Sequence, residues 1–356
     1  MESKIIVSAP GRICLFGDHQ DYLGLTVIPA AFAQRTFVEG EKIDGSNVYI
    51  SAIDINQKDQ IDLNKDIQYE KGKLNYCRAL INVFKQQGYL ENIGLDVKIH
   101  SQVPLSSGMS SSAALLISFA GFLNAVLNLN LPPIEIAELA YVAEHDELQI
   151  PCGRMDQYSS ALGGLFAMNC TTPPEIEPLK AELPGLIAVN SKVKKTTAET
   201  HSTILNKAEY AINALERDFN FDLKHTPLEY ILPKLETLGN PYKNQMICSL
   251  KVRDNTQRAK AELKKSKPDL ELLGELLLNE QTALRDYGNF SHPMLEKIIK
   301  TSLQAGALGG KLSGGGMGGS VVLLAPNKIK SVVKAAKMIG TDPYPLKIGT
   351  GLKYQT

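Results

Sequence analysis

Residues 104–114 read PLSSGMSSSAA and gather small side chains and hydroxyl groups into one turn. An apolar run at residues 115–123 follows and predicts a helix. Backbone N–H groups can close on a polyanion where side chains are small, and a helix N-terminus attracts negative charge, so this turn can bind phosphate groups. Its serine hydroxyls could also bind a Mg²⁺ ion. The same composition is common in turns that only cap a helix, and the turn alone does not decide between the two.

A polar cluster, GDHQDY, occupies residues 17–22 between apolar runs at 13–16 and 27–32. It holds two carboxylates, an imidazole, an amide and a phenol, which need partners if they are buried. One interpretation is a solvated turn. The flanking apolar runs favour a position at the rim of a packed domain, where carboxylates and an imidazole are well suited to hold sugar hydroxyls.

A glycine-rich segment, GGKLSGGGMGGS, occupies residues 309–320 and precedes a strand-like apolar run at 321–324. So many glycines ahead of a buried strand predict close approach of the backbone to a ligand or to another segment.

In this order the three segments resemble the three motifs of the GHMP kinases, the superfamily of galactokinase, homoserine kinase, mevalonate kinase and phosphomevalonate kinase. The resemblance runs from about residue 8 to about residue 325. The cluster at 17–22 and the stretch PCGRMDQ at 151–157 resemble the galactokinase branch most closely. One departure is Asp18, which is a methylene shorter than the glutamate usual in that branch.

The resemblance implies a role for each candidate residue. The catalytic carboxylate would be Asp156, with Arg12 as its cationic partner. The residues that hold or line the sugar would be Asp18, His19, Asp21 and Gly153. Those around the nucleotide would be Ser106, Ser107, Gly108, Ser110, Ser111, Ser112, Gly314, Gly315 and Gly316. Mg²⁺ would be bound by Ser112 and Glu144.

The chemistry of Asp156 and Arg12 suits phosphoryl transfer, which consists mostly of positioning and charge stabilisation. The acceptor hydroxyl must lose its proton, and an aspartate beside an arginine can accept or orient it. The arginine can also stabilise the charge that is transferred. Without the resemblance, the same two residues would be interpreted as an interdomain salt bridge.

Composition sets the remaining limits. The 356 residues include 38 Lys and Arg and 38 Asp and Glu, so no charge excess points to nucleic acid or an anionic membrane as partner. The five cysteines lack a CxxC spacing and indicate reduced thiols in the cytoplasm. No apolar run reaches the ~18 residues of a membrane span. We expect a monomer or weak dimer.

The pattern predicts mixed α and β structure, with strands at 97–100 and 163–168 and helices at 75–87 and 134–147. The resemblance implies a two-domain α+β fold of the GHMP kinase type. Residues 1–178 would form a domain like domain 2 of ribosomal protein S5, with the nucleotide turn and Asp156. Residues 179–356 would form a ferredoxin-like domain.

The function that this resemblance implies is transfer of the γ-phosphoryl group of ATP to the anomeric hydroxyl of galactose or a close relative. One alternative is a mevalonate-type kinase of a small alcohol, although the cluster at 17–22 suits a polyol better. Another is a regulator that binds sugar and ATP without turnover, against which the intact Asp156 and Arg12 argue.

Overall fold

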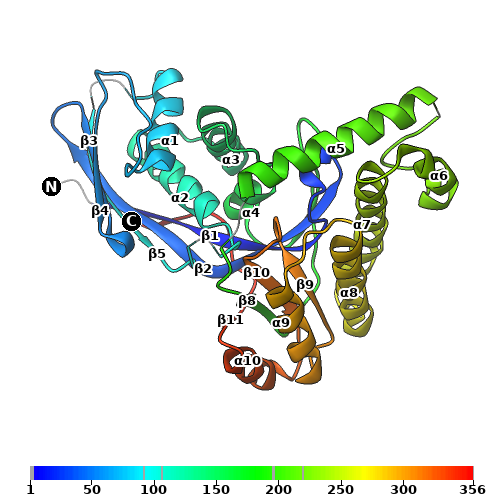
Figure 1. The fold of residues 1–356 in the computed structure, drawn as a ribbon. Helices are drawn as coiled ribbons and strands as arrows, with labels where there is room; N and C mark the ends of the chain where they lie inside the picture. Colours follow the sequence, from blue (N-terminus) through cyan, green and yellow to red (C-terminus); the bar gives the residue numbers. More distant parts are fainter. Residues whose placement is uncertain (1–3, 91–92, 106, 195–196, 219, 356) are drawn as a thin grey trace.

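The computed structural model describes residues 4–90, 93–105, 107–194, 197–218 and 220–355. Two sheets organise the chain, and helices cover both of them (Figure 1). The mixed α and β content predicted from the sequence is confirmed. Among the described residues no helix is both long and apolar enough to cross a lipid bilayer.

The first sheet is built on two long antiparallel strands, β1 (Ile5–Phe16) and β2 (Thr26–Ile43). Its strand order is β12-β1-β2-β5-β3-β4, and a short extension adds β6 and β7. The remaining strands are β3 (Asn47–Ala52), β4 (Gln57–Asp62), β5 (Gly94–Ser101), β6 (Phe166–Asn169), β7 (Glu175–Pro178) and β12 (Lys353–Gln355). The register of β1 against β2 shifts between Pro10 and Arg12 and again between Cys14 and Phe16. Such bulges bend a strand, so β1 curls as it approaches its polar end.

Four helices cover one face of this sheet (Figure 1). They are α1 (Asn75–Gln86), α2 (Ser111–Val126), α3 (Pro133–Val142) and α4 (Met155–Leu162). The predicted helix at 75–87 is therefore confirmed. Most residues of α2 are buried and apolar on all sides, as expected for a helix enclosed between a sheet and other helices.

Two expected elements differ from the structure. The helix predicted at 134–147 ends as α3 at Val142 and continues as a π-helical turn, Ala143–Glu147. The strand predicted from residue 163 begins only at Phe166, because Gly163 and Gly164 have positive φ values of 70° and 72°. A Cβ atom at Gly163 would overlap the backbone of Gly351, so the chain end passes closely over this turn.

The second sheet has the order β11-β8-β10-β9, with antiparallel pairs throughout. Its strands are β8 (Leu186–Asn190), β9 (Gly309–Ser313), β10 (Ser320–Leu324) and β11 (Asp342–Pro345). Side chains alternate between its two faces: Val322 and Leu324 belong to one apolar cluster, Val321 and Leu323 to another. The sheet is therefore covered on both sides.

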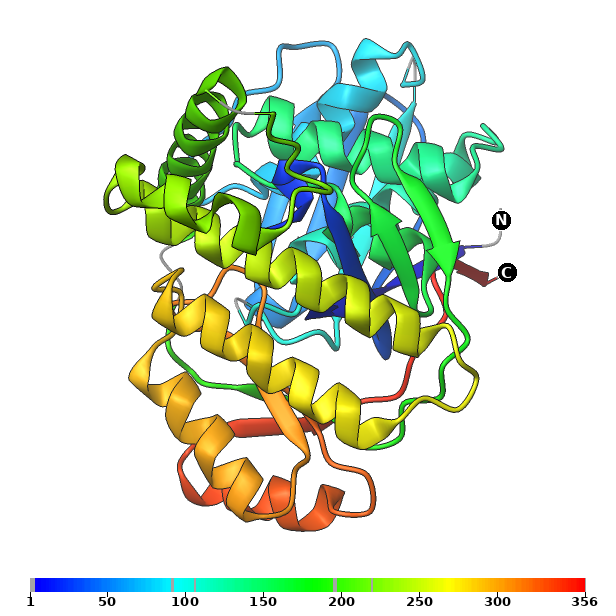
Figure 2. The same cartoon turned by 90° about the vertical axis from the view of Figure 1, so that its right-hand side faces the viewer.

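Helices α9 (Pro293–Gln304) and α10 (Ile329–Met338) cover the outer face of the second sheet (Figure 1). Helices α7 (Tyr242–Leu263) and α8 (Leu270–Asp286) run side by side in Figure 2 and pack between the two sheets. Outside this core lie α5 (Thr197–Asp218) and α6 (Leu228–Leu235). The last strand, β12, returns to pair with β1 in the first sheet. The expected boundary between residues 178 and 179 stays a prediction.

Candidate active site

Arg12 and Asp156, 144 residues apart in sequence, form a bidentate ion pair. Arg12 lies at the bulge of β1, and Asp156 lies in the first turn of α4. The guanidinium donates from Nε to Asp156 Oδ1 over 2.7 Å and from Nη2 to Oδ2 over 2.6 Å. The Arg12 side chain is 6% exposed and that of Asp156 is 28% exposed, so a buried cation holds a carboxylate that still reaches open space. Burial is the largest single effect and lowers the pKa of Arg12, but the charge and hydrogen bonds of Asp156, with smaller effects of Cys14 and Asp18, together outweigh burial and raise the pKa of Arg12.

The serine-rich turn is bonded directly to this pair. Arg12 Nη1 donates to the Gly108 carbonyl over 3.0 Å, and the Ser110 hydroxyl donates to Asp156 Oδ2 over 2.6 Å. Ser110 is the N-cap of α2, yet its side chain does not cap the helix. It also has a left-handed backbone with φ 55°, which is uncommon for a residue other than glycine and is often found at functional sites. The N–H groups of the first turn of α2 therefore stay available to another acceptor, which argues against a turn that serves only as a cap.

The other residues of the turn surround the start of α2. Ser111 and Ser112 begin the helix and are half-buried. Ser107 is buried, and its carbonyl accepts a 2.6 Å hydrogen bond from Ser320 at the start of β10. Ser106, which the resemblance assigns to the nucleotide, lies outside the described residues.

Glu144 lies on the π-helical turn and is buried, with 6% of its surface exposed. Gln157 Nε2 donates to its Oε2 over 2.7 Å, and Ser112 hydrogen-bonds to the same side chain. Burial, followed by the charge of Asp156, raises the pKa of Glu144 to about 7, against the effect of these two hydrogen bonds. An added cation would offset this cost of a buried charge. A carboxylate and a hydroxyl are oxygen donors of the kind that Mg²⁺ takes beside phosphate groups, so Ser112 and Glu144 fit such an ion.

The residues that the resemblance assigns to the sugar meet at a small cavity of about 70 Å³. Its lining includes Arg12, Asp18, His19, Asp21, Gly153, Asp156, Gly314 and Gly315. Asp21 packs so closely against Gly153 that a Cβ atom there would overlap the Asp21 carboxylate. The fit explains why residue 153 must lack a side chain.

His19 and Asp18 are more enclosed than Asp21. The ring of His19 stacks on Phe290 with 4.0 Å between centroids, and its Nδ1 lies 2.8 Å from the Tyr22 hydroxyl. The Asp18 side chain has no exposed surface. Its Oδ2 pairs with Lys311 Nζ and its Oδ1 accepts the Gly314 N–H. Direct contact of Asp18 with a sugar stays a prediction, and it would require the carboxylate to share these donors.

Some glycines of the glycine-rich segment line the cavity, and another packs against a neighbouring segment. Gly314 and Gly315 line the cavity beside Asp156. Gly316, with φ 74°, leaves no room for a Cβ atom because the Phe290 carbonyl lies against it.

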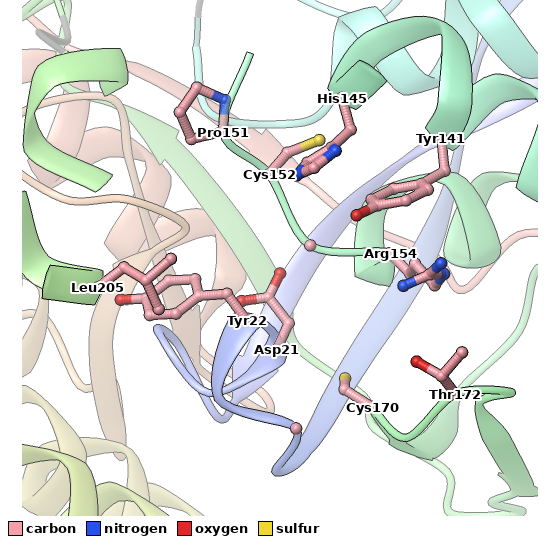
Figure 3. Close-up of a pocket in the computed structure, with 12 residues that line it drawn as sticks. Asp21, Tyr22, Tyr141, His145, Pro151, Cys152, Arg154, Cys170, Thr172 and Leu205 are labelled. Atoms are coloured by element: carbon pink, nitrogen blue, oxygen red, sulfur yellow. The ribbon is translucent and has the colours of Figure 1, made fainter. Parts of the chain in front are cut away.

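A larger cavity of about 370 Å³ adjoins the first and shares Asp21, Tyr22, Cys152 and Gly153 with it (Figure 3). Arg154 lies 4.1 Å from the centroid of the Tyr141 ring, and its Nε donates to Glu138 over 2.9 Å. The smaller cavity alone is below the ~300 Å³ lower end for small-molecule sites, and the larger one is within that range. The Asp21–Gly153 contact lies between the two cavities. Together the two cavities have room for a small metabolite.

Sequence reasoning from the motifs missed several residues around the site. Gln157, Lys311 and Glu280 bond to the expected residues, although no motif role was assigned to them. Ser110 bonds to Asp156, a contact that the motifs did not indicate, and its expected contact with the nucleotide stays a prediction. Gln157 follows Asp156 directly in sequence, and that adjacency is the only local signal for it.

Three family models match the chain. The GHMP kinases N terminal domain matches residues 75–164, the GHMP kinases C terminal model matches residues 259–339, and the galactokinase galactose-binding signature matches residues 1–42. They cover the serine-rich turn, the glycine-rich segment and the polar cluster at 17–22.

Curated relatives match over nearly the whole chain. The galactokinase of Pasteurella multocida is 30% identical over 366 residues, which cover 98% of this chain and 90% of that protein. The mevalonate kinase of Pyrococcus furiosus is 29% identical over 362 residues, which cover 99% and 98%.

Among solved structures, Lactococcus lactis galactokinase complexed with galactose is similar to the whole chain. The TM-score is 0.89 at 24% sequence identity, and the match covers 99% of this chain and 95% of that one. The expected α+β fold of the GHMP kinase type is confirmed.

Proposed function

The chain belongs to the GHMP kinase family, within its galactokinases, and we propose that it transfers the γ-phosphoryl group of ATP to the anomeric (C1) hydroxyl of galactose or a closely related sugar. The observation that carries this proposal is the bidentate contact of Arg12 with Asp156, hydrogen-bonded through Ser110 to the N-terminus of α2. This contact supports the proposal because a carboxylate that can accept a proton, a buried positive charge and a helix N-terminus suited to phosphate lie side by side.

In this mechanism Asp156 takes the proton of the sugar hydroxyl on one of its carboxylate oxygens. The carboxylate already accepts three hydrogen bonds, two from Arg12 and one from Ser110, which fix its orientation. The proton leaves late, when transfer of the phosphoryl group is well advanced, as the loose transition state of such reactions allows. Arg12 keeps its charge in the buried site and stabilises the oxygens that carry the transferred charge.

The nucleotide phosphates would lie over the first turn of α2, on the free N–H groups of Ser111 and Ser112 and against Gly108. Gly314 and Gly315 would bring a wall without side chains up to the same space. We propose that Ser112 and Glu144 hold Mg²⁺ there. When bound, this ion neutralises phosphate charge.

The sugar would lie in the smaller cavity with its reacting hydroxyl toward Asp156. The carboxylate of Asp21, which faces Gly153, would accept hydrogen bonds from the sugar hydroxyls. His19 and Asp18 would complete the turn behind Asp21. The larger cavity adjoins this one beyond Asp21 and Gly153 (Figure 3).

A coupled assay of ADP release over a panel of sugars and mevalonate tests this function. We expect ADP to form with ATP and galactose, and ³¹P NMR of the product to show phosphate on C1. Release of ADP with mevalonate and none with sugars would assign the chain to the other activity among its relatives. Binding of galactose and ATP without ADP release would make it a regulator.

We also propose that the enzyme acts in the cytoplasm as a monomer or weak dimer. All five cysteines are free thiols in the structure, which supports a reducing compartment. Light scattering on the purified protein tests its oligomeric state.

A further inference from the structure

Three charged side chains from distant parts of the chain are buried together behind the sugar cavity. Asp18, Glu280 and Lys311 all have side chains with no exposed surface. Lys311 Nζ pairs with Asp18 Oδ2, lies 3.6 Å from Glu280 Oε1 and donates to the Leu312 carbonyl over 2.8 Å. One ammonium group thus faces two carboxylates in a space closed to water.

Each carboxylate of this buried cluster also holds the backbone of a motif. Glu280 Oε1 accepts the N–H of Gly17 over 2.9 Å and that of Asp18 over 3.3 Å. Asp18 Oδ1 accepts the N–H of Gly314 in the glycine-rich wall. The cluster therefore joins the turn at residues 17–18, the glycine-rich segment and helix α8.

Two neighbouring amide side chains hydrogen-bond to this cluster and to the strand that carries Lys311. Asn255 Nδ2 donates to Glu280 Oε2 over 3.2 Å, and Gln281 Oε1 accepts the Leu312 N–H over 2.8 Å. A buried group of charges is costly to desolvate and adds little stability compared with apolar packing. The directional contacts of this cluster instead fix how two segments, nearly 300 residues apart, meet at the cavity.

We infer that Asp18 is a positioning residue rather than a sugar ligand. Through Gly314 and Lys311 it holds the glycine-rich segment at a fixed distance from the polar turn at residues 17–22. The inference rests on the proposed function. Asp18 is a methylene shorter than the glutamate usual in this branch, and both of its oxygens are already engaged, one by Lys311 and the other by the N–H of Gly314. Direct recognition of the sugar by this turn then falls to Asp21.

Asp18→Asn tests the inference through sugars that lack one hydroxyl. The variant keeps an oxygen for the Gly314 N–H and removes the charge that faces Lys311. Wild type and variant are compared by kcat/KM on galactose and on its 2-, 3-, 4- and 6-deoxy analogues. We expect a loss of about 10- to 100-fold, the size of a positioning error, and the same loss within about twofold on every sugar. A loss that disappears on one analogue would show that Asp18 binds the missing hydroxyl, and would overturn the inference.

Lys311→Met is the second variant, because Asp18→Asn could fold poorly. The Lys311 side chain has no exposed surface, and Lys311 is not among the residues that line the sugar cavity. We expect a similar loss that is again equal across the sugars, whereas wild-type kcat/KM in the folded variant would overturn the inference.

The matched control is Asp59→Asn. Asp59 is another buried aspartate; it lies on β4 and pairs with Arg78 of α1 at 2.7 and 2.8 Å, and neither residue lines the two cavities of the site. The control should lose stability and keep wild-type kcat/KM. If its kcat/KM falls as far as that of Asp18→Asn, general destabilisation explains both and the inference fails. If the wild type turns over none of these sugars, the proposed function itself is refuted.

Discussion

The exchange Asp156→Asn changes the contact on which the proposed mechanism depends while it keeps the shape of the side chain. Asp156 Oδ1 accepts Arg12 Nε, and Oδ2 accepts both Arg12 Nη2 and Ser110 Oγ. An asparagine offers one oxygen and one NH₂ group. Whichever way it is oriented, its NH₂ group faces at least one donor of Arg12, so at least one hydrogen bond is lost.

The expected loss of activity can be worked out from these contacts. Loss of a general base costs about 10²- to 10⁴-fold in rate, or roughly 3 to 5 kcal/mol in activation free energy. Breaking a buried ion pair costs about 3 to 5 kcal/mol of stability, and less here because Asp156 is 28% exposed. Binding of ATP should change little, because Arg12 still donates to the Gly108 carbonyl over 3.0 Å and its N–H to the Met109 carbonyl over 3.2 Å.

The assay is ADP release at saturating galactose and ATP, together with calorimetric titration of the variant with ATP. We expect kcat to fall at least 100-fold with the dissociation constant of ATP within about threefold of wild type. A kcat within about threefold of wild type would remove Asp156 from the mechanism. Loss of ATP affinity in parallel with kcat would show that the exchange disturbs the serine-rich turn and not the chemical step alone.

Three further predictions concern the surroundings of Asp156. Because burial raises the pKa of Glu144 from 4.5 to about 7, the folded protein holds a proton that the unfolded chain releases, and the free energy of unfolding should fall by roughly 3 kcal/mol as pH rises through that range. Glu144→Gln should abolish this slope in urea unfolding without Mg²⁺, and an unchanged slope would assign it to other groups. Gly153→Ala should displace the Asp21 carboxylate and raise the KM for galactose about tenfold or more with the KM for ATP unchanged, as initial rates would show; equal changes in both would contradict the assignment of Asp21 to the sugar. Ser110→Ala should lower kcat about 10-fold and the free energy of unfolding by about 1 kcal/mol through loss of one hydrogen bond to Asp156, because alanine keeps the Cβ atom and does not relieve the left-handed backbone; thermal unfolding and kcat together check this.

Local sequence patterns predicted the elements near the site better than their ends. The helix at α1 follows from apolar periodicity, and it forms within one residue of the predicted bounds. The π-helical turn after α3 could not be predicted, because a single widened turn leaves the residue pattern almost unchanged. It places Glu144 beside Ser112 and Gln157, and these contacts belong to the tertiary structure.

The pairing of Arg12 with Asp156 was expected from the family resemblance and not from the spacing of these residues. Nothing local to residue 12 indicates a partner 144 positions away. The structure brings the two together, and their roles in catalysis remain a proposal. The engagement of Asp18 by Lys311 lay beyond both kinds of reasoning, because the partner is 293 residues away and the resemblance assigned Asp18 to the sugar.

These two ion pairs show why a motif match leaves the role of a charged residue undecided. Asp156 and Asp18 both lie in motifs, and both pair with a cation whose side chain is buried. They differ in what remains open: Asp156 is 28% exposed toward the cavity, whereas Asp18 has no exposed surface and gives its second oxygen to the Gly314 N–H. A carboxylate that must take a proton from a substrate has to keep one face open, and a carboxylate that must hold two segments together is better protected from competing water. We therefore propose that exposure of the side chain, rather than the identity of the motif, separates the acid–base group of this site from the group that positions its walls.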